Sequence, residues 1–229
     1  MRALYQHTLV DQEIYQLKGE EAHHLINVVR IELQEEVLLL NGAGLRIKTL
    51  VSSVSKREVL LSKIEAQIVQ PTSCFDLALG IPKKEALELC LKEAVELGFR
   101  RIYLIRSAYS QTKLPENERL EALMISALEQ SNASYLPLVI PTSWEELKVS
   151  DYDHILMMDS QHSSTGVTKS NRLQKHLLIV GPEGGFSASE ASYLHHLPRV
   201  KVLNLPTAIL RTPTAVATGA GIILGSLLD

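Results

Sequence analysis

The sequence predicts an α/β protein of two domains: a small β-rich domain over residues 1–70 and a larger α/β domain over residues 74–229. Two observations support this division. The first part of the chain is a series of β-rich runs, whereas strand-like and helix-like segments alternate through the second part, a pattern typical of a mostly parallel sheet. Between them, Gln70–Cys74 holds a proline and small polar residues, which often mark a domain boundary.

The first domain reads as strands separated by turns. Asn41-Gly42 lies between two apolar runs, which is a strong hairpin signal, and Ser55–Arg57 separates the next two runs. Gly19–Ile31 has apolar residues at helical spacing. We therefore expect a small β-barrel or sheet with one helix.

The second domain opens with a strand over Phe75–Ile81 and a helix that Pro82 begins and Gly98 ends. Ser187 and Glu190 have the spacing of a capping box. Thr212 is expected to cap the last helix, with Pro213 in its first position. The remaining strands are expected at residues 100–107, 136–141, 154–159, 176–181 and 199–205, and the remaining helices at 116–132 and 187–197.

Bulk properties exclude several classes of protein. The net charge of the 229 residues is -3, so any nucleic acid must be bound by a local basic patch. Cys74 and Cys90 form no CxxC and have no histidine at ligand spacing, which argues against a disulfide framework or structural zinc. No secretory signal is visible, and Thr212–Leu228 is too short and too rich in small residues for a membrane span. We therefore expect a cytoplasmic protein that contacts no membrane.

The paired histidines are weak candidates for a metal site. His23-His24 lies at a predicted helix start and His195-His196 near a predicted helix end. Because adjacent helical residues point to different faces, neither pair is expected to bind metal.

A glycine-rich turn is the first candidate site. Gly181–Gly185 follows the apolar run His176–Val180 and precedes a helix start. Ligands of parallel sheets lie beyond the carboxyl ends of the strands, although a tight strand-to-helix turn would explain the glycines equally well. Neither GxGxxG nor a Walker A sequence is present. Glu183 would repel phosphate but tolerate a cation or a hydrogen-bond donor, so a cofactor with a sulfonium, an ammonium and a ribose fits better than ATP.

The loop before the last helix is the second candidate site. Arg211 lies one residue from the expected helix N-terminus. An anion or a polarised carbonyl there could be bound by the Arg211 side chain on one side and by the free helix N–H groups on the other. An exposed loop arginine is the alternative. The helix itself is rich in alanine and glycine, and glycine in a helix interior costs about 1 kcal/mol relative to alanine. Close packing of another element against the helix is the expected reason.

Taken together, these stretches resemble a known family. "LIVGPEGGFSASE" and "LNLPTAILRTPTA", with "HHLINVVRIELQEEVLLLNGAG", "LKEAVELGFRRIYLIRS" and "ALEQS", resemble the RsmE-type 16S ribosomal RNA uracil-N3 methyltransferases of the SPOUT superfamily. The resemblance runs over nearly the whole chain. It implies a PUA-like β-barrel, a SPOUT α/β domain with a trefoil knot, and S-adenosylmethionine bound in that knot. It also implies a homodimer and, as target, N3 of a uridine in the decoding region of 16S rRNA in the small ribosomal subunit.

The resemblance also suggests roles for individual residues. No metal ion is expected at the site. Arg211, with the helix N-terminus at Thr212, would stabilise the negative charge that spreads over uracil O2 and O4; no general base is evident. RNA contacts are expected from Arg30, Lys83, Lys84, Lys92 and Arg106. Cofactor contacts are expected from Val180, Gly181, Glu183, Gly184, Leu205 and Leu210.

Four positions depart from the family pattern. Ala133 and Ala208 stand where arginines are usual, Pro206 replaces a glycine, and Pro213 replaces a glutamate. Loss of the two arginines removes cationic contacts that could hold RNA. Two alternatives therefore stay open: a non-catalytic RNA-binding paralogue, and a SPOUT methyltransferase acting on another RNA position or on a ribose oxygen.

Overall fold

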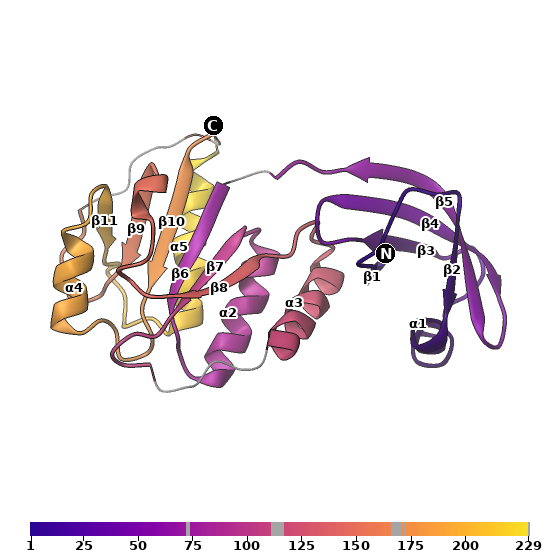
Figure 1. Cartoon of the computed structure of the whole chain (residues 1–229), viewed down its shortest axis with the longest axis horizontal. Helices are drawn as coiled ribbons and strands as arrows, with labels where there is room; N and C mark the ends of the chain where they lie inside the picture. The colour runs from indigo at the N-terminus through magenta and orange to yellow at the C-terminus, as the bar shows by residue number, and fades with distance from the viewer. Residues whose placement is uncertain (72–73, 111–116, 166–170, 172, 229) are drawn as a thin grey trace. The chain divides into compact units, whose positions relative to one another are not determined.

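The computed structural model of the protein (Figure 1) describes residues 1–71, 74–110, 117–165, 171 and 173–228. The chain forms two compact units. One comprises Met1–Pro71 with Ile125–Leu136, and the other comprises Thr72–Met124 with Pro137–Asp229. Within the described ranges, no helix combines the length and the apolar character that crossing a membrane requires.

The first unit is built on a five-stranded mixed sheet in the order β1-β3-β4-β5-β2. β1 pairs with β3 in parallel and the other pairs are antiparallel. The register between β4 and β5 shifts twice, and such bulges bend and twist a strand. The sheet curls into a half-barrel. Its strands are β1 (Arg2–Tyr5), β2 (Ile14–Lys18), β3 (Glu36–Leu40), β4 (Leu45–Val54) and β5 (Glu58–Ile68).

Both turns predicted in this unit are confirmed. Asn41-Gly42 lies in the connection between β3 and β4, and Ser55–Arg57 lies between β4 and β5. The expected helix is present but irregular, because α1 (Gly19–His23) continues as a π-helix, η1 (His24–Val29). It ends at Arg30, whose φ of 54° is left-handed.

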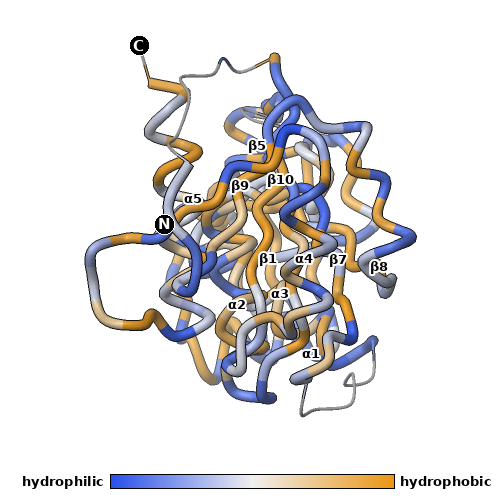
Figure 2. Tube along the Cα trace, turned by 90° about the vertical axis from the view of Figure 1, so that its left-hand side faces the viewer, coloured by the Kyte–Doolittle hydropathy of each residue, from blue (hydrophilic) through white to orange (hydrophobic). Residues whose placement is uncertain are grey.

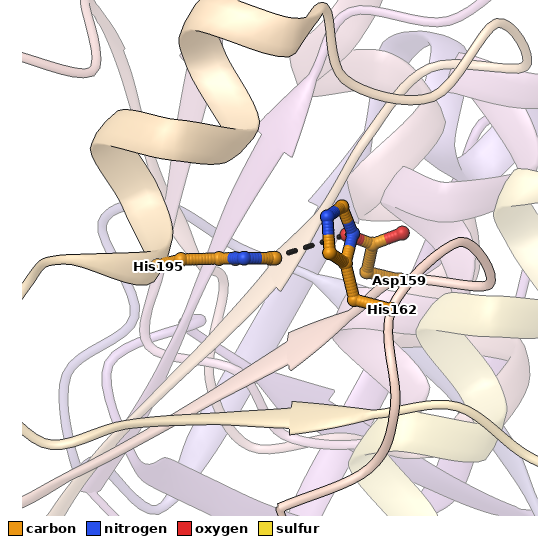
Figure 3. Close-up of side chains that lie close together, drawn as sticks. All are labelled: Asp159, His162 and His195. Carbon is orange, nitrogen blue, oxygen red and sulfur yellow. Dashed lines mark hydrogen bonds and ion pairs between the residues drawn. The ribbon is translucent and has the colours of Figure 1, made fainter.

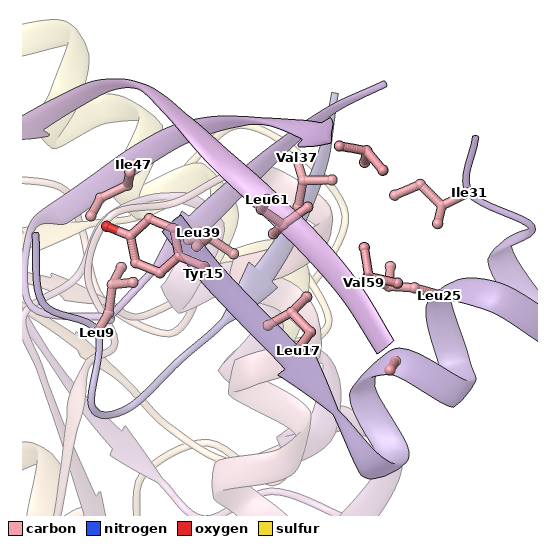
Figure 4. Close-up of a cluster of buried hydrophobic side chains, with 12 residues drawn as sticks. Leu9, Tyr15, Leu17, Leu25, Ile31, Val37, Leu39, Ile47, Val59 and Leu61 are labelled. Atoms are coloured by element: carbon pink, nitrogen blue, oxygen red, sulfur yellow. The ribbon is translucent and has the colours of Figure 1, made fainter. Parts of the chain in front are cut away.

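Aliphatic side chains from these strands and the helix form the core of the first unit (Figure 4). Two of its buried hydroxyl groups are hydrogen-bonded to backbone carbonyls, as is usual for buried polar groups. The hydroxyl of Tyr15 donates to the carbonyl of Val10 at 3.0 Å, and the hydroxyl of Thr49 donates to the carbonyl of Val37 at 2.8 Å.

A stretch from the middle of the chain completes this unit. The Glu129 carboxylate accepts a hydrogen bond from the amide of Tyr5 at 2.8 Å. The Tyr135 hydroxyl donates to the carbonyl of Val69 at 2.7 Å. Residues 125–136 therefore pack with the first unit, whereas the sequence assigned all of 74–229 to the second domain.

The second unit contains the expected parallel sheet, in the order β11-β9-β10-β6-β7-β8. Apolar residues fill its central strands, and Figure 2 shows β10 largely in the orange of hydrophobic residues. The six strands are β6 (Cys74–Gly80), β7 (Arg101–Ile105), β8 (Leu138–Thr142), β9 (His154–Met158), β10 (Lys175–Val180) and β11 (Val200–Leu203).

Helix ends follow the sequence signals with two corrections. α2 (Lys84–Glu96) has Lys83 as N-cap, so Pro82 precedes the helix, and Gly98 follows its end with a φ of +80°. α5 (Thr212–Ser226) has Arg211, not Thr212, as N-cap, so Pro213 occupies its second position. The capping box of Ser187 and Glu190 opens α4 (Ala188–His195) as predicted. The other helices are α3 (Asn117–Ser131) and the 3-10 turn η2 (Val149–Asp151).

Close packing explains one of the glycines of α5. The helix packs on β10 and β9, and a methyl group added at Gly219 would lie 2.6 Å from Cδ1 of Leu178. The space above Gly221 and Gly225 is open instead. Cys90 is buried in the core, while the side chain of Cys74 lies outside the part of the chain that the structure describes.

Candidate functional site

A cavity of about 310 Å³ lies where β9, β10 and β11 end. Its walls are the segments that follow these strands, Asp159–Gln161, Gly181–Phe186 and Asn204–Leu210, together with the first turn of α5. Parallel sheets bind ligands beyond the carboxyl ends of their strands, and this volume suits a small-molecule cofactor.

The glycine-rich turn forms one wall of the cavity. The amide of Gly185 donates to the carbonyl of Pro182 at 2.8 Å, and Gly185 has a φ of +71°, which favours glycine. Gly184 lies against Tyr109, because an added Cβ would be 2.8 Å from the Tyr109 Cβ. The turn is therefore shaped both by its own backbone and by a neighbouring loop.

Glu183 has a partner that the sequence did not reveal. Its two carboxylate oxygens lie 3.1 and 3.2 Å from the amide nitrogen of Lys83, the N-cap of α2. A carboxylate at a helix N-terminus satisfies a free N–H and interacts favourably with the helix dipole. Glu183 also lines the cavity, so it joins the glycine-rich turn to α2 and places a negative charge beside any ligand.

The second predicted loop forms the opposite wall. Leu205 and Leu210 line the cavity, and the buried Thr212 joins the two walls because its hydroxyl donates to the carbonyl of Gly181 at 3.4 Å. Arg211 is exposed and is not among the lining residues, although Leu210 and Thr212 on either side of it are. Arg211 thus lies beside the cavity, at the N-terminus of α5.

All six residues proposed for the cofactor line this one cavity: Val180, Gly181, Glu183, Gly184, Leu205 and Leu210. The described lining includes two acidic residues, Asp159 and Glu183, and no lysine or arginine. Apolar side chains supply much of the remaining surface. The cavity therefore offers an apolar wall and negative charge, which disfavours a phosphate-rich ligand.

Comparison with known families identifies the chain. A family model described as an RNA methyltransferase domain matches residues 70–224, and one described as an RNA methyltransferase PUA domain matches residues 17–64. The chain belongs to this family of RNA methyltransferases. The PUA match falls within the curled sheet, and the methyltransferase match covers the parallel sheet and its cavity.

Relatives of this RNA methyltransferase carry one shared name. Ribosomal RNA small subunit methyltransferase E of Bacillus subtilis is 28% identical over 221 residues, covering 88% of this chain and 86% of the relative. The protein of that name from Rickettsia conorii is 26% identical over 207 residues, covering 86% and 83%.

Solved structures share the fold over almost the full length. Methyltransferase E of Neisseria gonorrhoeae, bound to S-adenosyl methionine, superposes with a TM-score of 0.84 at 21% identity and covers 99% of this chain and 98% of that chain. A putative methyltransferase of Legionella pneumophila, in complex with the same cofactor, gives 0.81 at 23% identity and covers 99% and 98%.

The basic residues proposed to contact RNA lie at several places on the RNA methyltransferase. Lys83 and Lys84 are exposed at the start of α2, and Lys92 is half-buried further along that helix. Arg106 is exposed directly after β7. Arg30, in the first unit, is exposed at the end of the π-helix.

The four family departures also have defined places. Ala133 belongs to the stretch that packs with the first unit. Pro206 and Ala208 are exposed on the second loop, where Ala208 lines the cavity. Pro213 is buried in the first turn of α5, a position where proline is tolerated because the first amides of a helix have no intrahelical partner.

Glu190 organises the wall behind the glycine-rich turn. Beyond its capping role, its Oε1 accepts hydrogen bonds from the Ser107 hydroxyl at 2.7 Å, the Ala108 amide at 2.9 Å and the Trp144 indole at 3.1 Å. Burial alone would raise the pKa of Glu190, but hydrogen bonds from Ser187, Ala108 and Ser107 lower it. The sequence indicated the cap, but its other three partners come from distant segments.

A cluster of three ionisable side chains lies beside the cavity (Figure 3). Asp159 Oδ2 lies 2.7 Å from Nδ1 of His162 and 3.2 Å from Nε2 of His195. The sequence singled out the adjacent pairs His23-His24 and His195-His196 and expected no metal at either. The structure separates the second pair: His195 joins the cluster, whereas His196 Nδ1 contacts the carbonyl of Ser192. The proximity of Asp159 and His195 depends on the fold, because the two residues are 36 positions apart in the sequence.

Proposed function

We propose that this RNA methyltransferase uses S-adenosylmethionine to methylate N3 of a uridine in the decoding region of 16S rRNA in the small ribosomal subunit. The observation that carries the cofactor assignment is the acidic, partly apolar cavity at the carboxyl end of the sheet. Support for the substrate comes from relatives named small subunit methyltransferases, and support for the cofactor from similar folds bound to S-adenosyl methionine. The trefoil knot of the SPOUT superfamily stays a prediction, as does a cytoplasmic location.

The donor group and the cavity are complementary. S-adenosylmethionine supplies a methyl group on a positively charged sulfur. The carboxylate of Glu183 favours a cation, while Val180, Leu205 and Leu210 offer apolar surface to an adenine ring. Calorimetry should show binding of S-adenosylmethionine. Tight binding of ATP without a response to S-adenosylmethionine would contradict the assignment.

The chain's contribution to the chemistry would be positioning and charge stabilisation. Uracil N3 must lose its proton before or during attack, and the negative charge spreads over O2 and O4. Arg211 and the free amides at the start of α5 lie beside the cavity where they could stabilise that charge. We assign no general base, and propose that orientation of the reactants and exclusion of water supply the remaining acceleration.

A pair of variants tests this division of labour. Arg211→Ala should lower turnover by roughly 10²–10³, as loss of a charge-stabilising group does, with little change in cofactor affinity. Arg30→Ala should weaken RNA binding and reduce the slope of affinity against salt by about one, if Arg30 contacts a single phosphate. Lys83, Lys84, Lys92 and Arg106 are the further RNA contacts that we propose, to be tested in the same way.

The outcomes separate the alternatives. Near wild-type turnover by Arg211→Ala would remove Arg211 from the mechanism. A wild-type protein that binds small subunits but never methylates them would be a non-catalytic paralogue. Methylation at a ribose oxygen or at another base would retain the enzyme and change its substrate.

We also propose that the protein acts as a homodimer. The face of α5 that carries Gly221 and Gly225 is open, and small residues allow another backbone to approach closely. Light scattering should give about 51 kDa, twice the 25.4 kDa chain, at micromolar concentration. A monomeric mass together with full activity would contradict this assembly.

A further inference from the structure

The Asp159–His162–His195 cluster has the composition of a metal site. Among the described residues, these three side chains form the one group of His, Cys, Asp or Glu residues that could hold a metal ion together. Their ligand atoms lie within 4.8 Å of one another. The ligands come from two places: Asp159 and His162 lie in the segment that follows β9, and His195 ends α4. Figure 3 shows both imidazoles directed at the carboxylate.

The carboxylate is oriented by its own backbone. Asp159 Oδ1 accepts a hydrogen bond from the amide of Gln161 at 2.9 Å, and the Asp159 amide donates to the carbonyl of Leu203 at 3.2 Å. Oδ2 is thereby left for the two imidazoles. A ligating carboxylate whose second oxygen is held by a hydrogen bond is the usual arrangement around protein metals.

The donor set selects the class of ion. Two imidazole nitrogens and one carboxylate oxygen suit zinc and similar transition metals, whereas magnesium and calcium prefer oxygen ligands. Zinc bonds of about 2.0–2.1 Å in tetrahedral geometry place ligand atoms roughly 3.3 Å apart. The two nitrogen atoms lie 2.7 and 3.2 Å from Asp159 Oδ2, and all three ligand atoms lie within 4.8 Å of one another, so side-chain movement would have to bring them to that spacing.

Exposure leaves room for a further ligand. The side chain of Asp159 is 7% exposed, that of His195 21% and that of His162 46%. A bound ion would therefore have protein on one side and solvent on the other. The two histidines line a hollow with Gln161 and Phe186, next to the cofactor cavity and not inside it.

We propose that Asp159, His162 and His195 bind one zinc ion, with water completing its coordination. The ion would join the turn after β9 to the end of α4. Because Asp159 also lines the cofactor cavity, the ion would fix one wall of that cavity. This proposal is independent of the RNA substrate.

Metal binding by untagged, chelator-treated protein tests the proposal. Calorimetric titration with zinc should give one site per chain, and magnesium should give none. His162→Ala should weaken zinc binding by at least about 10–100-fold. That is the loss found when a residue that only hydrogen-bonds to a metal ligand is removed, and His162 would itself be a ligand. Zinc should raise the melting temperature of the wild type, because a ligand bound only by the native state stabilises it.

His196→Ala is the matched control, because His196 is an exposed neighbour of His195 outside the cluster. It should bind zinc like the wild type. Circular dichroism and metal-free melting of both variants establish that they fold. Unchanged zinc affinity in folded His162→Ala, equal loss in His196→Ala, or no binding by the wild type would each overturn the proposal and leave a hydrogen-bonded His–Asp–His group.

Discussion

Adding one methyl group at Gly184 should disturb the cofactor cavity through Tyr109. In Gly184→Ala the new Cβ would lie 2.8 Å from Cβ and 3.1 Å from Cγ of Tyr109. These atoms are close to the backbone, so a side-chain rotation cannot relieve the contact. The Tyr109 loop is itself held, because Glu190 accepts hydrogen bonds from Ser107 and Ala108. The glycine-rich turn is therefore expected to move.

The magnitude follows from the cost of overpacking. Overpacking a protein core typically costs about 1–3 kcal/mol, and this range is an upper bound at Gly184, which is exposed. If movement of the turn relieves this contact, S-adenosylmethionine affinity should fall by up to roughly 150-fold, since 1.4 kcal/mol corresponds to a factor of ten. Calorimetry on the wild type and Gly184→Ala measures this change directly.

A double variant tests the cause. Tyr109 is 48% exposed, so Tyr109→Gly alone should be folded. Combined with Gly184→Ala it should restore most of the lost affinity, because both the Cβ and the ring that the new methyl group would meet are gone. Wild-type affinity in Gly184→Ala, or no recovery in the double variant, would refute the reasoning.

Three further predictions concern stability. Burial, and the negative charge of the nearby Glu96, raise the pKa of Glu93 to about 7. The native state therefore binds the proton of the Glu93 carboxyl more tightly than the unfolded chain does. The free energy of unfolding should fall as pH rises from about 4 to 7. Glu93→Gln should remove that fall and stabilise the protein by roughly 1–2 kcal/mol at pH 8, measured by urea unfolding. Tyr152→Phe removes a 2.6 Å donor from the buried Asp76 carboxylate and should cost about 1–3 kcal/mol; an unchanged urea midpoint would contradict this. Gly219→Ala should lower stability by roughly 1–2 kcal/mol, because overpacking against Leu178 exceeds the gain in helix propensity, and a higher melting temperature would exclude that clash.

Local sequence signals predicted the elements well. The hairpin at Asn41-Gly42, the left-handed Gly98 after α2 and the capping box of Ser187 are all present. Each depends on residues within a few positions of one another, so the responsible contacts can be read directly from the chain. The parallel sheet followed from the alternation of strands and helices.

Contacts between distant segments could not be predicted from the sequence. The carboxylate of Glu183 holds an amide 100 positions away, and residues 125–136 pack with the first unit because Glu129 and Tyr135 find partners there. Asp159 and His195 meet only once β9 and α4 are placed. No periodicity or spacing along the chain encodes such pairs. The sequence could therefore point to the loops that line the cavity, but not to the distant partners of their residues.

The site of methylation is the most direct test of the account. Small ribosomal subunits from cells lacking the gene would be incubated with the purified protein and S-adenosylmethionine carrying a labelled methyl group. Nuclease fragments of the 16S rRNA would then be mapped by mass spectrometry. We expect one labelled uridine in the decoding region, methylated at N3, with incorporation reduced in Arg211→Ala. Absence of label, or label on another nucleotide or on a ribose oxygen, would contradict it.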